Sequence, residues 1–135
     1  MNKYNNIKCV VDGIKFDSRT EADYYIYLKN EKLKSRIQDF ELQPKFLLQP
    51  KFKKNNKTYR EINYVADFKI YMNDGTIMIV DIKGFKTTEF KLKQKLFEYK
   101  YPDLQLICLT YVKKHGGWVD LEALEQIRRD NRRKK

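Results

Sequence analysis

Asp81 and Lys83 are the two residues whose types and spacing point most directly to chemistry. They lie two positions apart in the segment 80–84, Val-Asp-Ile-Lys-Gly, whose β-branched residues predict a strand. Because successive side chains of a strand leave opposite faces, residues two apart share a face. We therefore expect a carboxylate and an ammonium group that can point at the same phosphate.

Asp67 offers a second carboxylate on the preceding predicted strand. Between residues 58 and 72, apolar residues recur at period two and are expected on one face, namely Ile62, Tyr64, Ala66, Phe68, Ile70 and Met72. Asp67 then lies on the opposite face. The Asn-Asp-Gly sequence at 73–75 predicts a tight hairpin, from which residues 76–83 return as the antiparallel partner strand. Across this hairpin Asp67 is expected to meet Asp81.

Two facing carboxylates repel each other unless a cation lies between them. Their hard oxygen ligands suit Mg²⁺ or Mn²⁺, and such a cation would polarise a phosphodiester and position water. Lys83 would orient or deprotonate the water, or stabilise the pentacovalent phosphate. His115 is the only histidine, which leaves little material for a histidine-metal nuclease or a Ser-His-Asp hydrolase. The pattern therefore indicates metal-assisted phosphodiester hydrolysis by carboxylates and lysine.

These residues and their order resemble the PD-(D/E)xK nuclease superfamily, whose signature is an Asp on one strand and a (D/E)-x-K run on the next. Here the signature residues are Asp67 and the Asp-Ile-Lys run at 81–83. The resemblance reaches from about residue 14 to residue 109, and it implies that a Glu on the preceding helix completes the metal site. Glu21 is the matching residue. The chain departs from the signature at Ala66, where the superfamily has proline, although that position varies widely among members.

The resemblance implies an α/β fold of the restriction-endonuclease-like kind, with a mixed central β-sheet flanked by helices, and metal-dependent endonuclease activity on DNA. In size and charge the chain is similar to small phage-encoded, resolvase-like members. A domain this small has no evident module for reading a base sequence. We therefore expect it to recognise branched or otherwise structured DNA, as a Holliday-junction resolvase does in phage recombination or replication. Two symmetric cuts at a junction would require a homodimer.

The elements that must position these residues follow from the apolar spacing. Helices are predicted at about 20–32, 88–100 and 119–129. The residues expected to face the core from the first two are Ala22, Tyr25, Ile26, Leu28, Phe90, Leu92, Leu96 and Phe97. A hairpin is expected around 12–13, extended segments over 37–52 and a short apolar strand at 104–110. The chain is expected to form one nuclease domain over 1–127, followed by a basic tail over 128–135.

Composition favours a nucleic-acid partner. In 135 residues, 29 Lys and Arg stand against 18 Asp and Glu, and the formal net charge of +11 attracts polyanions. No apolar run is long enough to span a bilayer and no signal peptide follows Met1, so no membrane partner is expected. We expect a cytoplasmic protein, in the host cell if the chain is phage-encoded. Cys9 and Cys108 lie far apart in apolar surroundings, which favours buried thiols over a zinc site.

A second set of residues is assigned to supporting roles. Lys86, Lys91 and Lys93 surround the start of the second helix and are candidates for phosphate contact, although a lysine-rich helix face is commonly only solvated. Gln43, beside Pro44, is an auxiliary candidate for aligning water or a ligand. As readily, Gln43 pairs with backbone at an edge strand.

Each main residue also has a purely structural interpretation. Glu21 lies three positions after Ser18 and could merely close a capping box, Asp67 could be a solvated sheet residue, and Asp81 with Lys83 could be a surface ion pair. Their arrival together in one hairpin context favours a metal site. Two other functional classes stay open. One is a non-catalytic DNA-binding or inhibitor protein on the same fold, and the other is an RNA nuclease or an accessory nuclease subunit.

Overall fold

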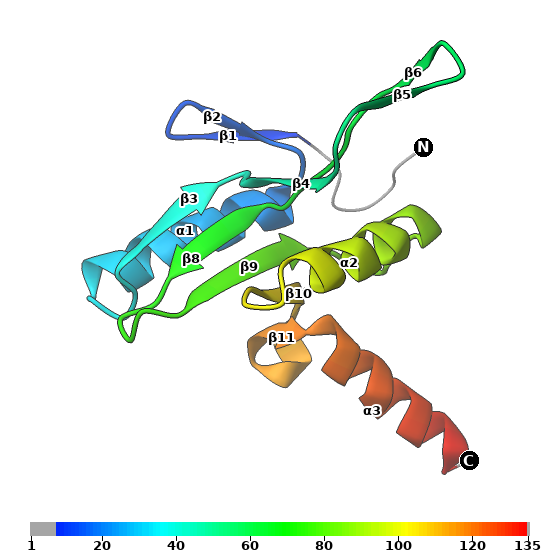
Figure 1. The fold of residues 1–135 in the computed structure, drawn as a ribbon. Helices are drawn as coiled ribbons and strands as arrows, with labels where there is room; N and C mark the ends of the chain where they lie inside the picture. The colour runs from blue at the N-terminus through cyan, green and yellow to red at the C-terminus, as the bar shows by residue number, and fades with distance from the viewer. Residues whose placement is uncertain (1–7, 135) are drawn as a thin grey trace.

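The computed structural model describes residues 8–134, in which a central sheet of five strands is flanked by three helices (Figure 1). In the order in which they lie side by side, the strands are β11 (Gly117–Asp120), β10 (Gln105–Val112), β9 (Ile77–Ile82), β8 (Phe68–Tyr71) and β3 (Asp39–Leu42). β9 and β10 are parallel and the other neighbours are antiparallel. The expected α/β class with a mixed central sheet is confirmed. The residues directly after Met1 and Lys135 of the expected basic tail lie outside the described residues.

Three two-stranded antiparallel ladders stand outside this sheet in the described part of the chain. They are β1 (Cys9–Val11) with β2 (Ile14–Phe16), β4 (Lys45–Gln49) with β7 (Ile62–Val65), and β5 (Phe52–Lys54) with β6 (Lys57–Tyr59). The first ladder confirms the hairpin predicted around 12–13, and β3 and β4 confirm the extended segments predicted over 37–52. In Figure 1 the β5–β6 hairpin projects away from the rest of the molecule.

One face of the sheet is covered by α1 (Arg19–Leu33). The helix begins where the Ser18 hydroxyl accepts a hydrogen bond from the Glu21 N–H at 3.1 Å, which satisfies a helix-terminal donor. The side chains buried between α1 and the strands include Ala22, Tyr24, Tyr25, Leu28, Phe68, Ile70 and Val80. The predicted helix is confirmed, but Ile26 is wrong as a core residue because the buried face centres on Tyr25 and Leu28, and position 26 falls at its edge.

The opposite face is covered by α2 (Thr88–Lys100), with Leu121 at the start of α3 (Leu121–Arg133) joining the same core. The bounds of α2 are those predicted, and Phe90 and Phe97 are buried as expected. Leu92 is 58% exposed, so its placement in the core is wrong. It lies two positions from Phe90, about 200° around the helix, and therefore points away from the buried face.

The C-terminal elements are longer than the sequence suggested. The strand predicted at 104–110 extends to Val112 as β10, and a short 3₁₀ turn, η1 (Lys113–His115), leads into β11. The helix predicted at 119–129 begins only at Leu121, because Val119 and Asp120 belong to β11. It runs to Arg133, so the residues assigned to a basic tail from 128 onward continue α3 up to that point. Their side chains are exposed.

The segment 58–72 was predicted as one strand with a single apolar face, and this is wrong. Tyr64 and Ala66 pack beneath α2, whereas Phe68 and Ile70 pack beneath α1 on the other side of the sheet. Ile62 is exposed. The chain changes partner between Ala66 and Phe68, because β7 pairs with β4 while β8 pairs with β3 and β9. Period two is maintained on both sides of this crossing, so the pattern alone does not reveal it.

The tight hairpin predicted at 73–75 is confirmed. The Met72 N–H donates to the Thr76 carbonyl at 2.9 Å, and the Asp74 carboxylate accepts from both the N–H and the hydroxyl of Thr76. Gly75 adopts a φ of +91°, which favours glycine at this position. The resulting register pairs Phe68 with Val80, so that Asp67 comes next to Asp81.

Two further expectations concern the whole chain. Among the helices of residues 8–134, none combines the length and the apolar character that a membrane crossing requires. Both cysteines are free thiols in the structure, with Cys108 buried and Cys9 partly buried.

Candidate active site

Asp67 and Asp81 lie side by side at the point where the chain crosses the sheet, and each carboxylate accepts a hydrogen bond from a backbone N–H of the opposite segment. The Asp67 N–H donates to Asp81 Oδ1 at 2.9 Å, and the Ile82 N–H donates to Asp67 Oδ2 at 2.8 Å. The same Asp67 N–H lies 3.2 Å from the Val80 carbonyl. Between β7 and β8, where regular strand pairing is interrupted, the two carboxylates therefore accept hydrogen bonds from backbone N–H groups. The structure brings the two predicted acids together as expected.

Lys83 lies beside this pair. Its Nζ is 3.5 Å from Asp81 Oδ2 and 4.0 Å from the centre of the Phe90 ring at the start of α2. The Asp81 side chain is 4% exposed and the Lys83 side chain is 25% exposed. The pair is therefore not the solvated surface ion pair that was the alternative interpretation. Carboxylate and aromatic ring together hold the ammonium group near the surface.

Tyr64 is a site residue that the sequence analysis did not single out, since packing was its default interpretation. Its hydroxyl donates a hydrogen bond to Asp81 Oδ2, while its ring packs beside those of Phe90 and Phe97. Burial, followed by the charge of Asp81 and this hydrogen bond, raises the pKa of the Tyr64 hydroxyl, so it stays protonated as a donor. The sequence did contain a signal for this role, because a tyrosine expected in the core needs a hydrogen-bond partner for its hydroxyl.

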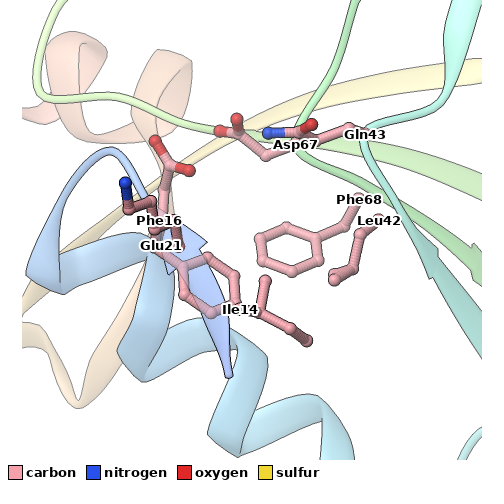
Figure 2. A pocket seen from close by; sticks show the side chains of 8 residues that line it. Ile14, Phe16, Glu21, Leu42, Gln43, Asp67 and Phe68 are labelled. Atoms are coloured by element: carbon pink, nitrogen blue, oxygen red, sulfur yellow. The ribbon is translucent and has the colours of Figure 1, made fainter. Parts of the chain in front are cut away.

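Glu21 approaches from the first turn of α1. Figure 2 shows its carboxylate directed toward Asp67, with Gln43 on the far side of Asp67. The three residues line a cavity of about 80 Å³, which has room for a few water molecules or an ion but not for a base. Gln43 is held in place because its N–H donates to the Asp67 carbonyl at 2.9 Å. The backbone N–H of Glu21 is thus bound by the capping residue Ser18, while its carboxylate lines the cavity. The structural and the functional interpretations of Glu21 are compatible.

Burial and neighbouring negative charge raise the pKa of Asp67 and of Glu21. Burial raises the pKa of Asp67 to about 8, with further contributions from the charges of Asp81 and Glu21. Burial also raises the pKa of Glu21 to about 7, followed by the charges of Asp17 and Asp81. The charge of Asp81 contributes to both shifts, so both carboxyl groups lie within its electrostatic reach, and a cation bound between the acids would oppose the two shifts.

Three hollows meet at these side chains. Glu21 and Asp67 line the cavity in Figure 2, and Glu21 and Lys83 line a second hollow beside Thr87. Asp67, Asp81 and Lys83 line a third, open hollow toward α2. The four main residues predicted from the sequence therefore occupy one junction, reached from both sides of the sheet edge.

The donor chemistry at this junction fits a hard divalent cation, since its carboxylates are crowded and neither histidine nor cysteine is among the described residues that line its three hollows. Glu21, Asp67 and Asp81 are the residues that would hold it. Within residues 8–134, however, no three His, Cys, Asp or Glu side chains are already arranged as a coordination group. Both oxygens of Asp81 accept hydrogen bonds. Binding a cation would therefore require these carboxylates to shift.

The predicted phosphate contacts have different surroundings. Lys86 forms an ion pair with Glu122 of α3 at 2.5 Å, and its side chain is only 10% exposed, so it is already partnered within the chain. Lys93 lines the third hollow, and Lys91 is exposed on α2. Lys93 is thus the one of the three that lies at the junction itself.

Comparison with known proteins places this site within a family. Residues 1–117 match the model of a family described as "Protein of unknown function (DUF1064)". The chain belongs to this family. The matched region contains all four main site residues and ends before α3, so it includes Lys86 but not its partner Glu122. No curated protein matches the chain.

Proposed function

We propose that this protein is a metal-dependent endonuclease that hydrolyses phosphodiester bonds in DNA, as its resemblance to the PD-(D/E)xK superfamily implies. One observation carries the proposal. Glu21, Asp67, Asp81 and Lys83, which come from three separate elements, meet at one sheet edge where hollows open to solvent. A chain with a net charge of +11 brings nucleic-acid phosphates to that edge.

Each residue has a distinct role in this proposal. Asp67, Asp81 and Glu21 bind the cation, which when bound supplies Lewis-acid activation of the phosphodiester and of the attacking water. Lys83 offsets negative charge on the phosphate or orients the water, and Asp81 with Phe90 restricts where its ammonium group can lie. Tyr64 fixes the orientation of Asp81, and Gln43 lines the cavity where water can be aligned.

The expected substrate is branched or otherwise structured DNA, in the manner of a Holliday-junction resolvase in phage recombination or replication. The residues that the structure describes form one small domain without a separate module for reading a base sequence, which favours recognition of DNA shape. Paired cuts at a junction would require a homodimer with two active sites. The expected location of this activity is the cytoplasm.

The test is cleavage of labelled DNA with Mg²⁺ or Mn²⁺, using a four-way junction, a flap, a single strand, a linear duplex and an RNA duplex. Wild type is compared with Asp67→Asn, whose amide oxygen can still accept the Ile82 N–H, and with Lys83→Gln. Lys34→Gln, at the end of α1 opposite Glu21, serves as the control for loss of one exposed positive charge outside the site. We expect cation-dependent cutting that both site variants lose and the control keeps. Cutting that survives in Asp67→Asn would exclude the proposed metal site.

A non-catalytic DNA-binding protein on this fold is the second candidate, and one observation favours it. Asp81 is saturated by Tyr64, the Asp67 N–H and Lys83, which is also what a purely structural carboxylate would show. The same assay separates the two. Tight DNA binding by wild type, without cutting of any substrate in either cation, would select this second function.

A further inference from the structure

The β5–β6 hairpin is a part of the molecule that neither the core nor the proposed active site explains. It forms a two-stranded ladder that no other strand in the described residues joins, and every residue from 51 to 60 is exposed. Figure 1 shows it reaching beyond the sheet and helices. A lone hairpin is marginally stable in water, so a projecting one needs its own local stabilisation. We call residues 51–60 the basic arm.

Two local features stabilise the basic arm. Asn55 and Asn56 have φ values of 52° and 60°, the left-handed conformations of a two-residue turn whose twist matches the strands. At the base, Phe52 pairs with Tyr59 across the ladder, and their rings stack with centroids 4.7 Å apart and planes at 7°. The arm is therefore a defined ribbon rather than an unstructured loop.

The charge of the basic arm is one-sided. Its ten residues contain no acid and five bases, namely Lys51, Lys53, Lys54, Lys57 and Arg60. None of the ion pairs in residues 8–134 involves these bases. Lys54 pairs with Lys57 across the ladder, where like charges oppose the pairing. Lysine can protect strand edges from aggregation, but that role does not require two lysines directly opposite each other. A polyanion would offset this repulsion.

The position of the basic arm relates it to the proposed site. The arm is continuous with the β4–β7 ladder, whose Asn63, Tyr64 and Val65 line the hollow that contains Asp67 and Asp81. Asn56 at the tip is eleven positions from Asp67 in the sequence. At about 3.3 Å per residue the tip reaches at most roughly 35 Å from Asp67, which is about one turn of duplex DNA.

We infer that the basic arm binds duplex DNA beside the site of cleavage, within about one helical turn of it. A two-stranded ribbon has the width that the major groove admits, and its lysines would contact phosphates along the groove. This inference rests on the proposed function for its DNA partner. A second copy of the chain is the alternative occupant, but two arms of like charge would repel each other.

The test is binding measured without turnover. Fluorescence anisotropy of a labelled duplex of about 30 base pairs in EDTA compares wild type with the double variant Lys53→Gln/Lys57→Gln. The control, Lys113→Gln/Lys114→Gln, removes the same charge from exposed residues at η1. Each lost phosphate contact flattens the salt dependence of log K by about 0.9, so we expect a slope reduced by about 2 and roughly tenfold weaker binding. The control should match wild type.

The length of the duplex adds a second readout. The arm variant and wild type should converge on a duplex of about 6 base pairs, which is too short to reach both the site and the tip, and diverge on longer ones. Equal affinity and equal salt slope for the arm variant and its control would overturn the inference. The inference would also be overturned if, without DNA, the arm variant sedimented as a smaller species than wild type, because the arm would then serve self-association.

Failure of the proposed function has a different signature from failure of the inference. If wild type binds duplex through the arm but cuts nothing with Mg²⁺ or Mn²⁺, the inference stands and the nuclease proposal fails. If wild type cuts and the arm variant binds and cuts equally well, the inference fails and the nuclease proposal stands.

Discussion

The junction of Asp67 and Asp81 and the basic arm are two charged regions at opposite ends of the β4–β7 ladder. At the junction, like charges are buried, hydrogen-bonded to backbone and crowded enough to raise the pKa of two carboxyl groups. In the arm, like charges stand in water, where screening weakens their repulsion without removing it. The first region therefore lowers the stability of the fold, whereas repulsion in the second opposes only the local pairing of the arm.

The difference shows how the two regions can be separated by experiment. Buried charges are retained at a stability cost where they have a function, because neutral residues would pack there more favourably. Exposed charges act at a distance and through contacts with phosphate. Substitutions at the junction should therefore change turnover and stability together, whereas substitutions in the arm should change DNA affinity alone.

The largest expected effect is on turnover. Asp81→Asn should lower the cleavage rate at saturating DNA by about 100-fold or more, or roughly 2.7 kcal/mol, because one carboxylate of the proposed metal site is lost. Its amide oxygen can still accept the Asp67 N–H. Single-turnover cleavage is the measurement. The arm variant Lys53→Gln/Lys57→Gln should keep the wild-type rate at saturating DNA, and a comparable loss in both variants would contradict the separation of roles.

The next effect, about 2 kcal/mol, is on stability against pH without divalent cation. Asp67 and Glu21 have folded pKa values of about 8 and 7, above their ordinary values of 3.8 and 4.5. Between about pH 4 and pH 8 the folded chain therefore holds more protons than the unfolded chain, so stability is greatest below this window and falls as pH rises through it. The value of about 2 kcal/mol for the change in the free energy of unfolding allows for solvent screening of partly exposed groups.

Denaturant unfolding in EDTA at pH 5 and pH 8 checks this expectation. Asp67→Asn should remove most of the pH dependence and exceed wild type in stability at pH 8. Added Mg²⁺ should stabilise wild type more at pH 8 than at pH 6, since it binds the ionised carboxylates. The arm variant should follow the wild-type pH curve. If the stability of wild type instead rises between pH 5 and pH 8, these two carboxyl groups do not determine its pH dependence.

The site could be predicted from the sequence further than the packing around it. Asp67, Asp81 and Lys83 were placed correctly relative to one another because a tight turn at 73–75 fixes the register of two adjacent strands. This relation is local in the chain. Glu21 lies far away in sequence, and only the resemblance to a known superfamily assigned it to the same place.

The errors share one physical cause, since period-two and helical patterns report that a side chain is buried but not against which element. The pattern at 58–72 was therefore assigned to one face, although Tyr64 and Phe68 are buried on opposite sides of the sheet. The hydrogen bond from Tyr64 to Asp81 forms because the chain changes sides of the sheet between Tyr64 and Phe68. With both residues assigned to one face, this hydrogen bond could not be predicted. Leu92 was misplaced because apolar character alone does not require burial.

A smaller effect is expected from Tyr64→Phe. The variant keeps the ring among Phe90 and Phe97 but removes the donor to Asp81, leaving one buried carboxylate oxygen with Lys83 as its remaining contact. We expect a loss of about 1 kcal/mol in stability and a several-fold lower cleavage rate with unchanged DNA affinity. Thermal unfolding, cleavage and anisotropy together check this. A variant with wild-type turnover would reduce Tyr64 to a packing residue.

The smallest effect tests whether the basic arm is energetically separate from the core. Phe52→Ala removes the stacked pair with Tyr59, which is worth about 0.5 kcal/mol when exposed. Because the arm shares no core contact, the loss should appear as about twofold faster amide exchange within the arm, with the global unfolding midpoint unchanged.

The matched comparison is Phe46→Leu in the adjoining β4–β7 ladder. Phe46 is buried against Tyr64, Phe97 and Tyr101, so its truncation should lower the global midpoint by several degrees. If Phe52→Ala also lowers the global midpoint by several degrees, the arm unfolds together with the core. Its rigidity would then be part of the fold, and the lysines it carries would be presented to DNA at a fixed distance from Asp67 and Asp81.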